Sequence, residues 1–226
     1  MIVMPSNNTG IRVGYLAGRY PGLLGHLYSV EATAGPFHFM PYALDNGAFP
    51  AFVKGEAWNE PAYWALINWC RLQTQAPRWV LVPDVVGERE ATISSWHRWA
   101  PILREFGWPL AFAAQDGMTP ADVPAEASVV FLGGSTEWKR QAIGPWCAAF
   151  PRVHVGRINT YRWLWYCADA GAESCDGTGW TRGDQDQWRG LEQWLSEASG
   201  ESARSIQTWC DFGPSGPLTV AGGRSS

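Results

Sequence analysis

The chain has 226 residues, of which 46% are hydrophobic and 17% charged, and its formal net charge is -4 at pH 7. This composition excludes collagen-like, coiled-coil and largely disordered proteins. The length favours a single domain, which we place at residues 1–210, followed by a Gly-, Pro- and Ser-rich tail at 211–226 that we expect to be mobile. No apolar run reaches the length of a membrane span and residues 1–8 lack a signal-peptide pattern, so we expect a cytoplasmic protein.

Two residue types are used unusually. Trp occurs 15 times, and such rings supply either core volume or flat surfaces on which bases and sugars stack. All but two of the 17 basic residues are Arg, which suits phosphate contacts but equally fits a GC-rich coding sequence. The five Cys contain no Cys-x-x-Cys pair and the four His show no ligand spacing, so we expect reduced thiols, no zinc site and no cofactor.

Short apolar runs alternate with segments of helical period along the chain, and this rhythm predicts a parallel sheet with crossover helices. Strands are expected at residues 2–5, 40–44, 79–82, 110–114, 129–132, 153–155 and, more weakly, 172–175. The best candidate for an eighth strand is 12–16. A compact (β/α) TIM-like barrel of seven to eight parallel strands without a zinc subdomain is therefore the leading fold, and an open doubly wound sheet is the alternative.

Three helices can be placed between these strands. Pro61 is expected to open one, because a proline at the first helical position loses no hydrogen bond. Apolar residues recur at three- and four-residue steps after Glu88 and again from Trp188 to Ala198, the period of one helical face.

Polar or glycine-containing clusters follow almost every predicted strand, at the rim where such barrels keep their active sites. They are LDNGAF at 44–49, VPDVVG at 82–87, AAQDG at 113–117, FLGGS at 131–135, VGRIN at 155–159 and SCDGTG at 174–179.

Three of these clusters contribute an aspartate from a different strand: Asp45, Asp84 and Asp176. Convergent carboxylates can divide acid, base and nucleophile roles, because their surroundings push their pKa values apart. Any one of them alone is more simply explained as a helix N-cap or a turn residue. Three at one rim indicate a functional site.

Other rim residues suit ligand binding. Gln115 could read the edge of a base, or could hydrogen-bond a neighbouring loop. Gly133 and Gly134 would let a ligand approach the backbone, although a glycine pair often forms only a turn. No Walker loop or dinucleotide fingerprint is present.

Residues 138–168 contain no acidic residue, and basic and aromatic side chains alternate there. This pattern suits a phosphate backbone with stacked bases, or else a solvated helix face beside core aromatics. Arg157 is the strongest phosphate-binding candidate, because it follows a predicted strand at the rim.

Taken in order, the rim clusters resemble the tRNA-guanine transglycosylase (queuine tRNA-ribosyltransferase) family, and more closely its DpdA-like, DNA-directed members. The resemblance covers about residues 2–182 and includes LDNGAF, VPD, AAQDG, GGS and CDGTGWTR. It departs from the family in Phe49, which replaces Tyr, and in Ala48, which replaces Gly. The zinc subdomain of the tRNA enzymes is also missing, which favours DNA over tRNA.

The resemblance implies roles for individual residues. Asp176 would be the catalytic nucleophile and Asp45 the general acid/base. The substrate-binding residues would be Phe49, Asp84, Gln115, Gly133, Gly134, Ser135 and Arg182, together with Arg157 from the basic stretch.

The activity implied is base exchange, in which a guanine in DNA is replaced by a 7-deazaguanine derivative through a covalent Asp–glycosyl intermediate. The partners would be DNA, the free 7-deazaguanine base and helper proteins, in the cytoplasm of a bacterial or phage-infected cell. Alternatives are base exchange in tRNA, a retaining glycoside hydrolase on the same barrel, and a nucleic-acid-binding module without activity.

Overall fold

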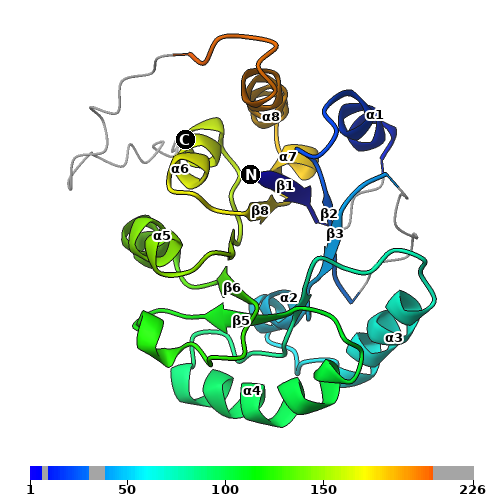
Figure 1. Cartoon of the computed structure of the whole chain (residues 1–226), viewed down its shortest axis with the longest axis vertical. Coiled ribbons are helices and arrows are strands. Elements are labelled where there is room, and N and C mark those ends of the chain that lie inside the picture. Colours follow the sequence, from blue (N-terminus) through cyan, green and yellow to red (C-terminus); the bar gives the residue numbers. More distant parts are fainter. Residues whose placement is uncertain (7–9, 31–38, 206–226) are drawn as a thin grey trace, which may run out of the picture.

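The computed structural model describes residues 1–6, 10–30 and 39–205, and Figure 1 shows the chain winding once around a ring of strands with helices outside it. The strands are β1 (Ile2–Pro5), β2 (His26–Tyr28), β3 (Tyr42–Leu44), β4 (Val80–Leu81), β5 (Leu110–Ala114), β6 (Val129–Leu132), β7 (Val153–Val155) and β8 (Ser174–Gly177). The helices are α1 (Ile11–Arg19), α2 (Ala48–Lys54), α3 (Glu60–Arg71), α4 (Arg89–Arg104), α5 (Thr136–Ala149), α6 (Tyr161–Asp169), α7 (Gly179–Arg182) and α8 (Gln185–Ala198), with a 3-10 turn at Pro120–Asp122.

All eight strands are parallel and follow the order β1-β8-β7-β6-β5-β4-β3-β2. Two isolated parallel bridges, Val3–Leu24 and Ser6–Leu27, connect β1 to the chain around β2 and nearly close the ring. The predicted TIM-like barrel is therefore confirmed. Its strand carboxyl ends all open on one side, which brings their loops together.

The candidate for the eighth strand, residues 12–16, is wrong. That segment lies in helix α1, where Val13, Leu16 and Ala17 recur at the three- and four-residue spacing of a helix and are buried. The strand is instead the three-residue β2, and it pairs with β3. The predicted domain end at 210 and the predicted tail at 211–226 lie outside the described residues.

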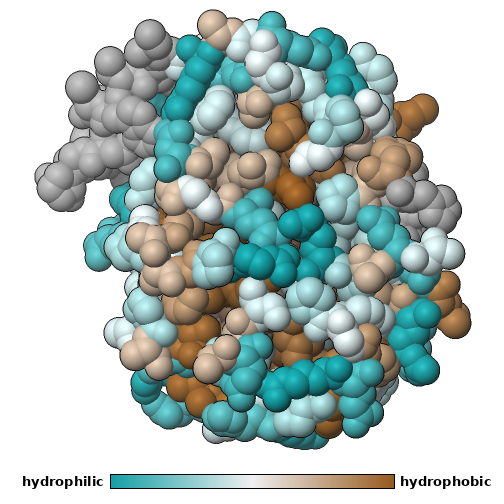
Figure 2. Space-filling view, in the orientation of Figure 1, coloured by the Kyte–Doolittle hydropathy of each residue, from teal (hydrophilic) through white to brown (hydrophobic). Residues whose placement is uncertain are grey.

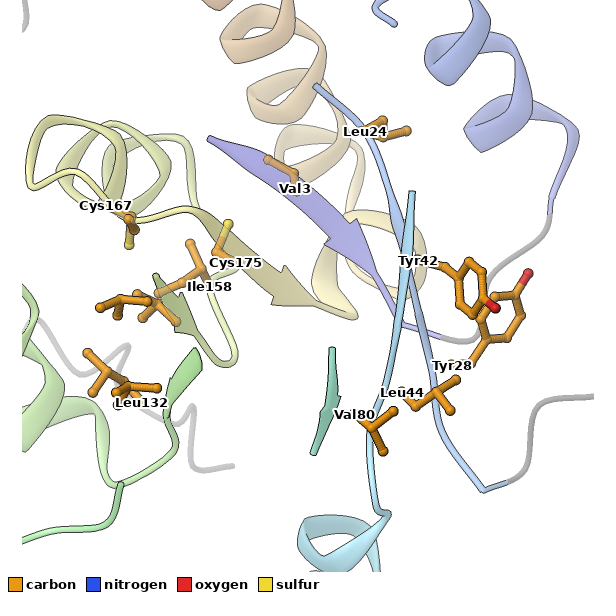
Figure 3. Packing of buried hydrophobic residues seen from close by; sticks show 14 of the residues in the cluster. Val3, Leu24, Tyr28, Tyr42, Leu44, Val80, Leu132, Ile158, Cys167 and Cys175 are labelled. Atoms are coloured by element: carbon orange, nitrogen blue, oxygen red, sulfur yellow. The ribbon is translucent and has the colours of Figure 1, made fainter. Parts of the chain in front are cut away.

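Side chains alternate between the inside of the barrel and the helix layer, as the pleat of a strand requires. The inner cluster is small and holds Met4, Leu27, Ala43, Trp79, Leu81, Ala111, Ala113 and Val129. The larger cluster packs strands against helices. Figure 3 shows part of it, including Tyr28 and Tyr42, whose rings lie 5.7 Å apart and meet edge to face.

The abundant Trp residues mostly provide core volume. Within the described part of the chain, seven are buried and seven more pack against the core while partly exposed. The buried ones are Trp79, Trp96, Trp99, Trp146, Trp180, Trp188 and Trp194. Trp abundance therefore gives no evidence for a base-stacking surface.

An ion-pair cluster lies at the amino ends of the strands. Glu173 accepts hydrogen bonds from Arg78 (2.5 Å between Nη2 and Oε1) and from Arg152 (2.6 Å between Nε and Oε2). Figure 2 shows hydrophilic side chains gathered over the middle of one end of the barrel. Burial of Glu173 disfavours its charge, but the bonds from Arg152 and Arg78 outweigh this and lower its pKa.

We expect Glu173→Gln to lower the free energy of unfolding by about 1–2 kcal/mol at pH 7, because two half-exposed guanidinium groups lose their anion. A carboxylate with a lowered pKa stabilises the fold above its unfolded-state pKa, and this stabilisation is lost as the pH falls through the folded-state pKa. The loss should therefore shrink in acid. Urea unfolding measures it, with the exposed Glu137→Gln as control, and equal losses at neutral and acid pH would contradict the assignment.

None of the helices among the described residues is long and apolar enough to cross a membrane.

Candidate functional site at the carboxyl end of the barrel

Three aspartates meet at the carboxyl end of the barrel. Asp45 directly follows β3, Asp84 follows β4 at a short distance, and Asp176 is the third residue of β8. Burial raises the pKa of Asp45 to about 7, and the negative charges of Asp176 and Asp84 add to this effect. The structure thus brings the three predicted carboxylates together, and burial places the pKa of Asp45 near neutral pH.

The loop after β3 holds Asp45 in place. The Ser29 hydroxyl and the Gly47 N–H donate to its carboxylate. Gly47 has φ +77°, and a Cβ there would lie 2.6 Å from the Val30 side chain, so only glycine fits this turn. The LDNGAF motif therefore has a geometric reason for its glycine.

Asp84 is fixed by two side-chain amides. Asn46 donates from Nδ2 to Oδ1 at 2.7 Å, and Gln115 donates from Nε2 to Oδ2 at 2.6 Å. Burial raises the pKa of Asp84, while the bonds from Asn46 and Gln115 oppose the rise. Gln115 is buried and its Oε1 also accepts from the Gly87 N–H at 3.3 Å. Its predicted role in base recognition stays a prediction.

Asp176 is held through one of its two oxygens. Oδ1 accepts from the His154 ring (3.0 Å from Nε2) and from the Arg157 N–H (3.2 Å), whereas Oδ2 accepts only a long bond of 3.4 Å from Ser6 among the described residues. His154 was not singled out in the sequence. The available signal was a lone polar residue in the strand VHV, which far more often reflects packing than chemistry.

Arg157 crosses the carboxyl end of the barrel. Its φ of +61° is rare for a side-chain-bearing residue. The guanidinium donates to the carbonyl oxygens of Gly133 and Gly134 and lies 4.3 Å from the ring centre of Phe49. Phe49 belongs to α2, which follows β3, four places from β7 in the strand order. The contact therefore connects opposite sides of the barrel end.

The glycine pair and Ser135 have structural partners. Gly134 has φ +39°, and a Cβ there would lie 2.4 Å from Asp116 and from the Trp138 ring. The Ser135 N–H donates to Asp116, and the Ser135 side chain caps helix α5 by accepting from Trp138 N. Their predicted contact with a base stays a prediction.

The predicted basic track is not one surface. Arg152 belongs to the ion-pair cluster at the opposite end of the barrel, and Lys139 is buried with its amine on the Gly156 carbonyl. Burial and the charge of Arg157 lower the pKa of Lys139 to about 8. Arg182 is exposed at the end of α7, and no hydrogen bond within the described ranges joins it to the three aspartates. A nucleic-acid partner stays a prediction.

Among the residues placed by the structure, no group of three His, Cys, Asp or Glu side chains has the arrangement of a metal site. Four cysteines fall in this part of the chain, and all four are free.

No protein-family model matches the chain, and no curated protein matches it in sequence. The folded chain is similar to 3-hexulose-6-phosphate synthase from Salmonella typhimurium, with a TM-score of 0.50 and 10% identity over 87% of this chain and 99% of that one. A second 3-hexulose-6-phosphate synthase gives 0.49 and 11% over 87% and 99%. Phosphoribosyl anthranilate isomerase from Thermus thermophilus gives 0.48 and 16% over 88% and 100%. At these identities the likeness establishes the fold.

These comparisons overturn the family prediction. The fold is similar to that of 3-hexulose-6-phosphate synthase rather than to that of a tRNA-guanine transglycosylase, and neither a family model nor a curated relative supports the motif matches. The predicted membership of the transglycosylase family was wrong, and so was the predicted exchange of guanine in DNA. The physical reason is that Asp, Gly and Gln at strand ends serve the turns and networks of this barrel.

Proposed function

We propose that the protein is an acid–base enzyme whose site is the aspartate cluster at the carboxyl end of the barrel. The observation that carries the proposal is the convergence of Asp45, Asp84 and Asp176 at the carboxyl end of the barrel, where burial and the two neighbouring charges raise the pKa of Asp45 to about 7. A group that is half protonated at neutral pH can both give and take a proton, which is what general acid–base catalysis requires. Elevated carboxylate pKa values at a barrel rim are typical of active sites.

The three aspartates then have different tasks. Asp45 transfers the proton. Asp84 accepts one hydrogen bond on each oxygen, from Asn46 and from Gln115, so it forms a rigid polar side of the site. Asp176 presents Oδ2 as a hydrogen-bond acceptor. Since carboxylates accept hydrogen bonds, the substrate is a small polar molecule that donates N–H or O–H groups.

The test is turnover of a defined mixture of small polar metabolites in D₂O, followed by mass spectrometry. The wild-type protein should convert or deuterate at least one compound at pH 7. Asp45→Asn should lose this activity, by about 10²–10⁴-fold. Asp186→Asn, which changes an exposed carboxylate on α8, should keep it. No change in any compound, or equal turnover by Asp45→Asn, would refute the proposal.

A further inference from the structure

His154 lies inside the barrel directly behind the aspartate cluster. It is the middle residue of β7 and has no exposed surface. Its ring stacks on Phe131 at 4.9 Å and meets Trp79 edge-on at 4.7 Å. Packing from two aromatic rings leaves this imidazole little freedom to turn, so its two nitrogens point in fixed directions.

Both ring nitrogens are engaged by β8. Nδ1 lies 2.8 Å from the Ser174 hydroxyl oxygen, and Nε2 lies 3.0 Å from Asp176 Oδ1. The sheet register explains this arrangement, because His154 is paired with Ser174 and residues two apart in a strand share a face. Ser174 and Asp176 therefore both point inward, one at each ring nitrogen.

The two partners of the ring favour one tautomer of His154. An ionised carboxylate can only accept, so Nε2 carries the ring proton and donates it to Asp176. In this tautomer Nδ1 is an acceptor, and Ser174 donates its hydroxyl proton to it. Hydrogen bonds are thus donated from Ser174 to His154 and from His154 to Asp176.

The order is the reverse of a hydrolase Ser-His-Asp triad. There the serine faces the substrate and the aspartate is behind the histidine. Here Ser174 has 0% of its surface exposed, while Asp176, with 7%, lies beside Asp45 at the barrel end. Ser174 cannot reach a substrate, so the group of this hydrogen-bonded row that faces a substrate is the Asp176 carboxylate.

We propose that His154 is the positioning residue of Asp176 and that Oδ2 is the oxygen that meets the substrate. His154 Nε2 and the Arg157 N–H together fix Oδ1, and Ser174 fixes the tautomer of His154. Oδ2 keeps only the 3.4 Å contact with Ser6 within the described chain. This inference rests on the proposed function in one respect, namely that Asp176 acts on a substrate.

The direct test is long-range ¹H–¹⁵N NMR of the imidazole rings in the full chain at pH 7.5. Loss of one ring's signals in His154→Phe assigns His154. We expect the tautomer with its proton on Nε2, and we expect this proton to be protected from exchange. Ser174→Ala should shift the ring nitrogen signals by removing the donor to Nδ1. A ring protonated on Nδ1, or a mixture of tautomers as in free solution, would overturn the proposal. If His154→Phe fails to fold, Asp176→Asn and Ser174→Ala identify the same ring.

A second arm separates positioning from packing. His154→Gln keeps an N–H donor near the position of Nε2, whereas His154→Phe keeps a flat ring but removes the donor. A crystal structure of the Phe variant should show the Asp176 carboxylate rotated, and turnover should fall about 10²-fold, with recovery in the Gln variant. An unmoved carboxylate with unchanged turnover would refute the role of His154. Unchanged turnover in Asp45→Asn would instead refute the proposed function and leave the tautomer result standing.

Discussion

Trp79→Ala should lower the free energy of unfolding by about 3–5 kcal/mol, because the substitution empties the centre of the barrel. Trp79 has no exposed surface and packs against Phe131 and His154. Its neighbours in the inner cluster include Ala43, Ala111 and Ala113, which are too small to fill the space. Collapse around the missing indole is therefore restricted, and most of the cavity should remain.

Urea unfolding measures this loss, and two variants act as controls. Trp163→Ala removes a partly exposed indole from α6 and should cost clearly less. Trp79→Phe keeps an aromatic ring and removes an indole N–H that finds no acceptor in the described chain, so it should be milder than Trp79→Ala. A cost below about 1 kcal/mol for Trp79→Ala would show that the interior is not packed as described.

Asp45→Asn should stabilise the protein at pH 8 by roughly 2–4 kcal/mol and have little effect at pH 4. The pKa of Asp45 rises from 3.8 to about 7 on folding. Between these values the folded state binds more protons than the unfolded state, so stability falls as the pH rises. Asn does not titrate, and the advantage of the variant should therefore grow across this window and stay constant above it.

Denaturant unfolding at several pH values provides the measurement. Asp186→Asn removes an exposed carboxylate on α8 and serves as the control, with a small effect on stability. A stability difference for Asp45→Asn that does not change between pH 4 and pH 8 would contradict the raised pKa. Such an outcome would leave the fold intact and remove the basis of the acid–base function.

The barrel was predictable because several of its strands are continuous apolar runs and several of its helices show amphipathic spacing. The strands at Leu110–Ala114, Val129–Leu132 and Val153–Val155 begin and end where the sequence predicts. Strand β2 was not predictable, because His26–Tyr28 is only three residues long and follows a Gly-Leu-Leu-Gly turn. The neighbouring helix α1 also contains apolar residues, and the sequence pattern therefore favoured an eighth strand there.

The aspartate cluster was predictable from topology, because parallel strands bring their carboxyl ends together. The partners of the aspartates were not. Asn46 is one polar residue in a turn motif, His154 is a single polar residue in the strand VHV, and Ser174 is the first residue of the strand SCDG. Their importance depends on register across β7 and β8, which no local pattern contains.

The family resemblance failed for a related reason. Its motifs consist of residues that the carboxyl end of a barrel uses for turns and networks. Gly47 fits a turn that excludes a Cβ, and Gln115 bridges Asp84 and the Gly87 N–H. Ordered short motifs of this composition therefore indicate the fold more strongly than they indicate a reaction.

The measurement that tests the central claim most directly is the titration of Asp45 by ¹³C NMR of its carboxyl carbon, in the wild-type chain and in Asp176→Asn. The account predicts a midpoint at about pH 7 in the wild type, and a lower one in the variant, because a neighbouring negative charge has been removed. A wild-type midpoint near the ordinary value of 3.8, or one that Asp176→Asn leaves unchanged, would contradict it.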